Sequence, residues 1–228
     1  MRLAFLVTAA FVAAGWTIPA AAQPEARIET SLGTIVVLLE SDKAPATVAN
    51  FIRYAKQGHF NNTVIYRIVP GFVVQTGSMK PDNTWKAAGK PIPLETANGL
   101  SNKRGTLAMA RDDKPASATA EFFINLADTN AQALDAKAGS APNTTGYAVF
   151  GKVTAGMEVV DAIVAVPLGG GKGYFPANYP KSPILIKKVT IGEAVLPPPV
   201  PAPDAVAVPA PAAPPVATPD PAAVPPAH

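Results

Sequence analysis

The sequence predicts a mainly β domain, an antiparallel barrel or sandwich capped by helices. Short runs rich in β-branched and aromatic residues recur along the chain, and only two segments carry helical signals. The chain lacks the strand–helix–strand alternation that would indicate a parallel sheet. The chain of 228 residues contains no cysteine, so the expected core must be stable without disulfides.

The two ends of the chain differ in composition from the part between them. We expect residues 1–22 to be a signal peptide, because a basic start and an apolar run precede Ala20-Ala21-Ala22, with cleavage before Gln23. A buried N-terminal helix is the alternative. Residues 197–228 are almost entirely Pro, Ala and Val, and they predict a disordered tail with polyproline II character. We interpret the tail as a spacer. The alternatives are a ligand for a proline-binding partner and a ligand for the domain's own groove.

Residues 23–196 remain for a single domain. The formal net charge of +3 is spread along the chain without a stripe of Lys and Arg, so we expect no nucleic-acid partner. After the N-terminal apolar run, no segment is long and apolar enough to cross a membrane. We expect an exported, periplasmic monomer with no integral membrane segment after signal cleavage.

The first half of the domain predicts a hairpin followed by a helix. Two β-rich runs, 26–30 and 34–40, are joined by Ser31-Leu32-Gly33. A helix is expected from Pro45 to Gly58, since proline favours a first turn and glycine a stop. The apolar side chains at helical spacing are Val48, Phe51, Ile52 and Ala55.

The segment 66–77 reads YRIVPGFVVQTG and places a cation, an aromatic ring and an amide in an otherwise apolar stretch. Two short β-type runs meet at Pro70-Gly71, a pair typical of a tight turn. The three side chains are Arg67, Phe72 and Gln75. A cation among such neighbours is either paired with a carboxylate or part of a working site, and the residues alone leave both open.

Strand alternation makes a more specific prediction for this segment, because successive side chains point to opposite faces. We expect Arg67 to share a face with Ile65 and Val69. Beyond the turn, we expect Phe72 to share a face with Val74.

The second half of the domain is expected to contain further strands and one helix. Residues 78–104 predict long loops around a short strand at 92–94, and 157–164 predict a helix. The remaining runs with strand composition are 106–110, 121–126, 147–153 and 184–191.

Nucleophilic and metal chemistry have few candidate residues. Only two histidines occur and one is the terminal His228, so a Ser-His-Asp arrangement would depend on His59 alone. His59 follows a predicted helix end, where a solvated or capping role is the simpler interpretation. No zinc ligand set and no nucleotide-binding glycine motif occurs, and Asp112-Asp113 is interpreted as a solvated loop pair.

The remaining constellation is a guanidinium and an amide among apolar groups. Without a family, these residues predict an apolar pocket with a cation, suited to binding a peptide. The set comprises Arg67, Phe72, Gln75, Met109, Phe122, Phe123 and Leu134.

At these residues the chain resembles a known family. The stretches TVIYRIVPGFVVQTG, NGLSNKRGTLAMAR, EFFINLAD and GYAVFGKVTAGMEVVDAI resemble, in this order, the cyclophilin family of peptidyl-prolyl isomerases, and most of all its exported bacterial members. The resemblance covers residues 26–191. It implies a closed eight-stranded antiparallel barrel capped by two helices, with a peptide groove on its outer face. It also implies an enzyme that acts on proline-containing unfolded or exported polypeptides, without a cofactor or metal.

The resemblance implies roles for individual residues. Arg67 matches the catalytic arginine, and Gln75 matches the amide that would orient it and bind the substrate main chain. The implied substrate-binding residues are Phe72, Val73, Met109, Ala110, Arg111, Glu121, Phe123, Leu134 and Tyr147. Among these, the side chains implied to hold the proline ring are Phe72, Met109, Phe123 and Leu134. Around Ala110 the resemblance implies contacts through the main chain.

Four positions depart from the commonest residues of that family. Tyr66 occupies a position where His is commonest, Val73 one where Met is commonest, and Glu121 one where Gln is commonest. Ala133 lies where some members carry Trp or Phe. We expect Val73 to make the proline floor shallower and stiffer, and Glu121 to add a negative charge near the groove. Ala133 argues against strong cyclosporin binding. A proline-binding chaperone or scaffold with weak or no turnover is the alternative function.

Overall fold

The computed structural model describes residues 23–170 and 175–193. The expected signal peptide and Pro/Ala-rich tail therefore lie outside the described residues. The strands are β1 (Pro24–Thr30), β2 (Gly33–Leu39), β3 (Thr63–Val64), β4 (Arg67–Val69), β5 (Val73–Thr76), β6 (Thr106–Met109), β7 (Phe122–Asn125), β8 (Val149–Ala155) and β9 (Leu185–Glu193). The α-helices are α1 (Pro45–Lys56), α2 (Asn130–Leu134) and α3 (Met157–Val164), with two 3₁₀ turns, η1 (Pro115–Ser117) and η2 (Pro176–Asn178).

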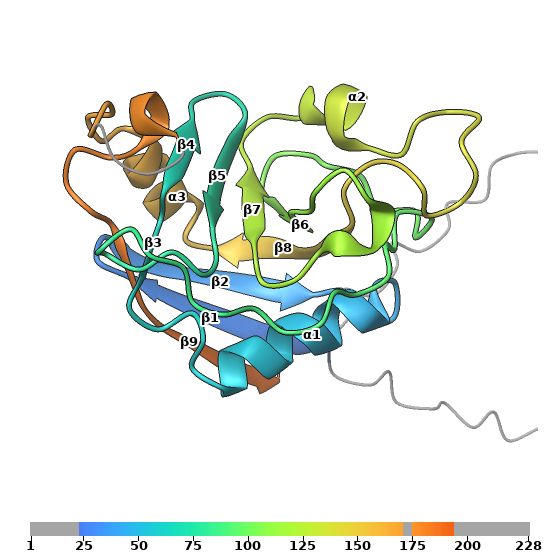
Figure 1. The fold of residues 1–228 in the computed structure, drawn as a ribbon, viewed down its shortest axis with the longest axis horizontal. Coiled ribbons are helices and arrows are strands. Elements are labelled where there is room, and N and C mark those ends of the chain that lie inside the picture. Colours follow the sequence, from blue (N-terminus) through green and yellow to red (C-terminus); the bar gives the residue numbers. More distant parts are fainter. Residues whose placement is uncertain (1–22, 171–174, 194–228) are drawn as a thin grey trace, which may run out of the picture. The chain divides into compact units, whose positions relative to one another are not determined.

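All nine described strands belong to one sheet with the order β3-β9-β1-β2-β8-β6-β7-β5-β4. Every pairing in it is antiparallel. The predicted mainly β class is therefore confirmed. Figure 1 shows α1 and α3 well apart, with strands of the sheet between them.

The expected closed eight-stranded barrel with two helices is wrong in detail. The described residues form nine strands and three α-helices, and no ladder joins β3 to β4, the two ends of the strand order. These two strands are nevertheless consecutive in the chain, so residues 63–69 connect the two ends and the sheet curls without full closure. Ile65 and Tyr66 separate β3 from β4 because their main-chain hydrogen bonds go to different strands. Ile65 N–H donates to Ile184 O, next to β9, whereas Tyr66 N–H donates to Gln75 O of β5.

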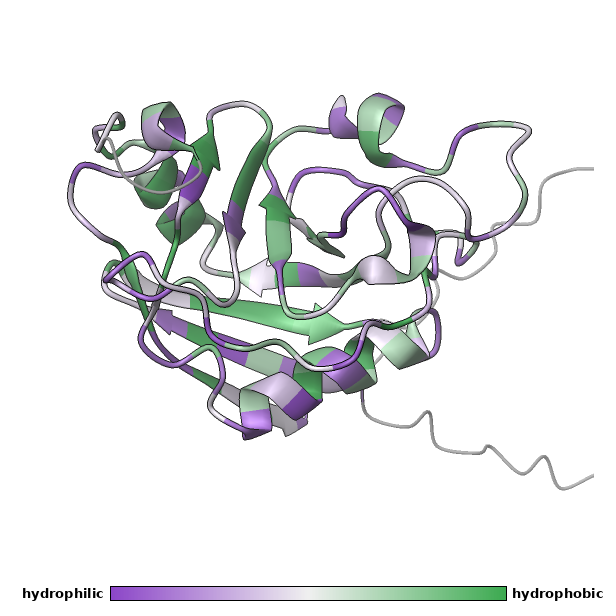
Figure 2. Ribbon diagram, viewed as in Figure 1, coloured by the Kyte–Doolittle hydropathy of each residue, from purple (hydrophilic) through white to green (hydrophobic). Residues whose placement is uncertain are grey.

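The predicted hairpin is confirmed. β1 pairs with β2 from Glu25↔Leu38 to Thr30↔Gly33. β1 alternates hydrophilic and hydrophobic residues in Figure 2, which places Ala26 and Ile28 in the core. The strand predicted at 147–153 begins later than expected, at Val149. The strand predicted at 92–94 is only an isolated bridge between Ile92 and Ala118.

Helix α1 packs its apolar face into the core, as predicted. Pro45 occupies the first turn, and the Glu95 carboxylate accepts hydrogen bonds from the main-chain N–H groups of Ala46 (3.1 Å) and Thr47 (2.8 Å). A carboxylate at this end also opposes the positive end of the helix dipole. No helix in the described ranges is long and apolar enough to cross a membrane.

An aromatic cluster joins α1 to the sheet. The Phe51 ring lies 5.1 Å from Phe60, 5.3 Å from Phe122 and 5.3 Å from Phe150, measured between ring centroids. All four side chains are fully buried. Edge-to-face and offset contacts of this kind add to the free energy gained by burial. The core on this side of the sheet leaves its opposite face available for a site.

The alternation predicted for segment 66–77 holds for Arg67 and Val69, which lie opposite the pocket residues Gln75 and Val73. It is wrong for Ile65 and for Phe72. Ile65 packs in the main core with Val74, whereas Arg67 lines a surface pocket. Strand β4 begins only at Arg67, so the break before it interrupts the alternation of side chains between the two faces of the sheet. Phe72 lies in the turn before β5 and contacts the pocket cluster of Val73 instead of the core.

Candidate active site

One row of residues crosses five neighbouring strands on the outer face of the sheet. The register places Arg67 opposite Gln75, Gln75 opposite Phe123, Phe123 opposite Ala108, and Ala108 opposite Val149. Directly opposite residues of antiparallel strands point to the same face. The row therefore carries a cation and an amide at one end and apolar side chains at the other, and the small Ala108 leaves space above it.

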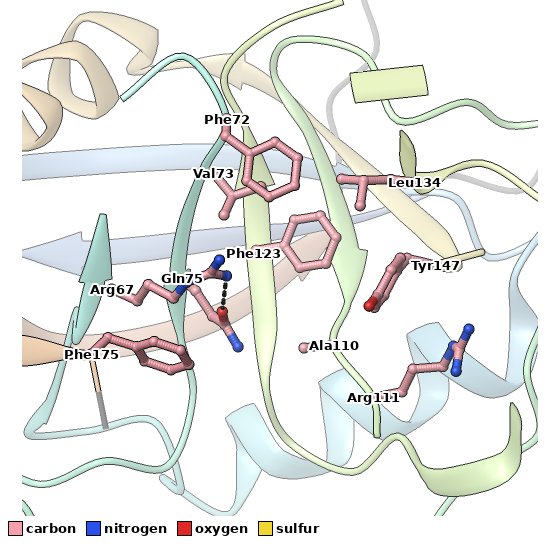
Figure 3. Close-up of a pocket in the computed structure, with 10 residues that line it drawn as sticks. All are labelled: Arg67, Phe72, Val73, Gln75, Ala110, Arg111, Phe123, Leu134, Tyr147 and Phe175. Carbon is pink, nitrogen blue, oxygen red and sulfur yellow. Dashed lines mark hydrogen bonds between the residues drawn. The ribbon is translucent and has the colours of Figure 1, made fainter. Parts of the chain in front are cut away.

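The β4–β5 hairpin fixes the polar end of this row. Gly71 has φ +73° in the turn, and Phe72 N–H donates to Val69 O at 2.9 Å, as the predicted Pro-Gly turn requires. Arg67 Nη1 donates to Gln75 Oε1 at 2.9 Å (Figure 3). Arg67 Nε is buried and has no hydrogen-bond partner among the described residues. The guanidinium is thus held in place while one donor is unused.

The apolar end of the row forms the wall of a pocket of about 280 Å³. Figure 3 shows Phe72, Val73, Phe123, Leu134 and Tyr147 gathered on one side of the pocket and Arg67 with Gln75 on the other. The Phe123 and Tyr147 rings meet edge to face at 5.6 Å. This arrangement can hold a small apolar ring beside a hydrogen-bond donor.

Buried asparagines fix the turn that carries Phe72. Asn130 Nδ2, at the start of α2, donates to Phe72 O at 2.7 Å and to Asn125 Oδ1 at 2.8 Å. Asn125 Nδ2 donates in turn to Asn102 Oδ1 at 3.1 Å. All three asparagines are buried, so each hydrogen bond offsets the cost of removing an amide from water.

Leu134 and Tyr147 are joined through the main chain, because Tyr147 N–H donates to Leu134 O at 2.9 Å. Arg111 Nε donates to Gly146 O at 2.8 Å, and its guanidinium lies 5.1 Å from the centre of the Tyr147 ring. A Cβ at Gly146, which has φ +80°, would lie 2.5 Å from Ala136 N. The main-chain hydrogen bond to Leu134 and the Arg111 contacts therefore hold the segment that carries Tyr147.

Two of the family departures contact each other. Tyr66 OH donates to Glu121 Oε2 at 2.8 Å, and Ser78 N–H donates to Glu121 Oε1 at 2.7 Å. The carboxyl lies flat against Gly77, where an added Cβ would be 2.6 Å from its carbon. Burial raises the pKa of the Glu121 carboxyl above its usual range. Burial and the neighbouring Glu121 charge also raise the pKa of Tyr66.

The match to a family model decides the assignment. Residues 26–191 match the model described as cyclophilin type peptidyl-prolyl cis-trans isomerase/CLD. The chain belongs to the cyclophilin family. The predicted assignment as a cyclophilin-type peptidyl-prolyl cis-trans isomerase, and hence as an enzyme, is confirmed.

Two bacterial relatives of this cyclophilin are each more than 40% identical to it. It is 43% identical over 164 residues to peptidyl-prolyl cis-trans isomerase B of Escherichia coli strain K12, covering 72% of this chain and 97% of that one. It is 44% identical over 184 residues to a peptidyl-prolyl cis-trans isomerase of Acinetobacter baylyi, covering 80% of this chain and 94% of that one.

Solved structures support the fold. A Cryptosporidium parvum cyclophilin type peptidyl-prolyl cis-trans isomerase matches with a TM-score of 0.60 and 26% identity, covering 75% of this chain and 99% of that one. A second structure of that protein, solved in the presence of the dipeptide Ala-Pro, matches with a TM-score of 0.59.

Most of the predicted site residues of this cyclophilin lie together. The pocket is lined by Arg67, Phe72, Val73, Gln75, Ala110, Arg111, Phe123, Leu134 and Tyr147, and by Phe175. The expected contact of the Met109 side chain with a proline ring is wrong, because alternation along β6 turns Met109 into the core and Ala108 outward. Glu121 lies in an adjoining cleft instead of this pocket. Ala133 is exposed on α2 and does not line the pocket.

Phe175 was not predicted from the sequence. The Arg67 guanidinium lies 4.9 Å from the centre of its ring, close enough for a cation–π contact. Phe175 precedes the short turn η2, far along the chain from β4, and stands in a glycine-rich loop without periodicity. The only sequence signal is a large aromatic residue beside a proline, which does not indicate a contact with Arg67. Among the described residues, no group of three or more His, Cys, Asp or Glu side chains is placed to hold a metal ion.

Proposed function

We propose that Arg67 stabilises the twisted X-Pro bond in the reaction of this isomerase. Resonance gives an amide C–N bond a rotation barrier of about 18–20 kcal/mol. As the bond twists, the proline nitrogen becomes pyramidal and regains a lone pair that an N–H donor can bind. A donor that binds this state better than either planar isomer lowers the barrier.

The observation that carries this role is a guanidinium that lines an apolar pocket and is fixed by the neutral Gln75 instead of a carboxylate. Its Nη atoms carry further N–H donors, and a substrate nitrogen can accept a hydrogen bond from one of them. The guanidinium is a planar, charged fork, so one N–H can bind Gln75 while another faces the substrate. We assign Phe72, Phe123 and Leu134 to the proline ring.

The substrates proposed are proline-containing polypeptides, and the solved relative obtained with the dipeptide Ala-Pro supports this class. The expected signal peptide supports exported proteins as clients and the periplasm as the compartment. Mass spectrometry of the protein from a periplasmic fraction tests the location. A mature N-terminus at Gln23 is the expected result, and a cytoplasmic protein that keeps residues 1–22 would contradict it.

Replacement of Arg67 tests the catalytic role. We expect Arg67→Ala to lower kcat/KM at least about tenfold, equivalent to about 1.4 kcal/mol of barrier, in an isomerase assay without a coupled protease. Arg27→Ala is the matched control, because Arg27 is a solvent-exposed arginine of β1. Circular dichroism should show both variants folded. Wild-type turnover by folded Arg67→Ala would refute the role of Arg67.

A further inference from the structure

A second cleft of about 230 Å³ adjoins the proposed proline pocket. The two share Gln75, Ala110, Arg111 and Phe175 in their walls, so a polypeptide bound in one can extend into the other. The cleft has room for a long side chain. Its chemistry differs from that of the pocket, since aromatic rings and carboxylates line it.

Three aromatic residues form one side of the cleft. Tyr66 is buried, at 2% exposure, between Trp85, which meets it edge to face at 5.2 Å, and Phe175, which stacks on it at 6.3 Å. The rings open to the cleft are those of Trp85 and Phe175, which are 39% and 37% exposed. The face of an aromatic ring attracts a cation, and the attraction increases where water is excluded. Phe175 already lies over the Arg67 guanidinium, which shows that a cation is accommodated at this edge of the aromatic group.

The Glu121 carboxyl lines the same cleft beside the Tyr66 hydroxyl. Its hydrogen-bond donors include the neutral Tyr66 hydroxyl and Ser78 N–H, and it forms no salt bridge with a Lys or Arg of the described residues. A partly buried carboxylate without a counter-charge gains free energy when a cation arrives. Asp112, exposed at the rim, adds a second negative charge.

The nearby cations are held by other groups. Arg111 donates to Gly146 O, and Figure 3 shows its guanidinium pointing away from Arg67 and Phe175. Lys86 Nζ donates to two main-chain oxygens, those of His59 at 2.7 Å and Asn61 at 2.6 Å. Arg67 is likewise held by Gln75. Among the described residues, no Lys or Arg forms a salt bridge with the Glu121 carboxyl, which therefore remains available to a substrate cation.

We infer that this cleft binds a lysine or arginine side chain close to the proline of the substrate. The inference rests on the proposed function and adds a substrate class to it. It depends on Glu121, which stands where a neutral Gln is commonest in the family, and on Tyr66, which holds the carboxyl in place. The selectivity therefore belongs to this chain's own residues.

A peptide series tests the inference on the full chain without any variant. Each peptide carries one Lys, norleucine or Glu at one of the three positions before or the three after a single proline. We expect Lys to exceed norleucine in kcat/KM by at least about threefold at one position, as a desolvated cation–π and charge contact allows, and Glu to fall below norleucine there. Equal values at every position would overturn the inference.

Glu121→Gln tests the residue, because an amide has nearly the same shape and can still accept the Ser78 hydrogen bond. The Lys to norleucine ratio should fall to about one in this variant. Glu158→Gln, on the exposed side of α3, is the control and should keep the wild-type ratio. A Lys preference that survives in Glu121→Gln would show that Glu121 is not its source.

Dissociation constants from NMR titration of the same peptides separate this inference from the proposed function. If the norleucine peptides bind but isomerise at the uncatalysed rate, the proposed function fails while the Lys preference can still be read from binding. If they isomerise rapidly and Lys gives no gain in rate or affinity, only the inference fails.

Discussion

At the residue scale, the question raised by Arg67 was whether its charge serves an ion pair or a site. Its hydrogen-bond partner is the neutral amide of Gln75, and it forms no salt bridge with a described carboxylate. The sequence could place Arg67 in an apolar stretch but could not identify this partner, because the pairing depends on the β4–β5 register. Phe175 was missed for a related reason, since only the tertiary fold brings it to Arg67.

Glu121 gives a prediction for stability against pH. Burial raises the pKa of its carboxyl above the usual value of 4.5, so the folded protein holds this proton more tightly than the unfolded chain. The stability from this group is present below the unfolded value and is lost as pH rises through the raised folded value. Glu121→Gln removes that loss.

The free energy of unfolding of Glu121→Gln, relative to the wild type, should therefore increase from about pH 4 to about pH 8. Urea denaturation at both pH values measures this difference. Glu158→Gln serves as the exposed control and should show no comparable trend. A difference between Glu121→Gln and the wild type that does not change with pH would contradict the assigned cause.

At the element scale, the short helix α2 holds the Phe72 turn against the sheet. Asn130 begins α2 and bonds both Phe72 O and the Asn125 side chain. The sequence motifs predicted β5 and β7 but not α2, which is too short for a periodic signal. Leu134, at its end, was assigned to the pocket only through the resemblance.

Removal of the Asn130 side chain tests this support. Asn130→Ala leaves the buried Asn125 amide short of a donor and should cost about 1–3 kcal/mol of stability, as measured by urea denaturation. KM for proline peptides should rise because the Phe72 wall is less well held, with a smaller change in kcat. Gln132→Ala, exposed on the same helix, is the matched control. Equal stability of Asn130→Ala and the control would rule out this role.

At the scale of the whole molecule, the mainly β class and the hairpins followed from composition and alternation, whereas the strand count did not. The break at Ile65 and Tyr66 splits one apolar run into β3 and β4. Ile65 bonds Ile184, far along the chain, whereas Tyr66 bonds Gln75 of the strand that follows β4. Alternation was likewise insufficient for Met109, whose direction depends on which face of β6 is covered. Local patterns specify elements, while long-range pairings decide which side chains meet.

The tail gives a prediction at the same scale. Among the described residues, the apolar core extends from Ala26 to Ile191, so a protein of residues 23–196 should match one of residues 23–228 in free energy of unfolding and in kcat/KM. Parallel denaturation and isomerase assays measure both. If residues 197–228 instead occupied the domain's own groove, the shorter protein would bind proline peptides more tightly.

Exchange NMR on a proline peptide with wild-type and Arg67→Ala protein tests most directly whether Arg67 lowers the rotation barrier. Uncatalysed exchange takes on the order of tens to hundreds of seconds, so acceleration is easily detected. We expect the wild type to accelerate exchange, and Arg67→Ala to bind with a dissociation constant within about threefold of the wild type while exchange slows at least about tenfold. Wild-type protein that shifts peptide resonances without accelerating exchange, or Arg67→Ala that accelerates it equally, would contradict this account.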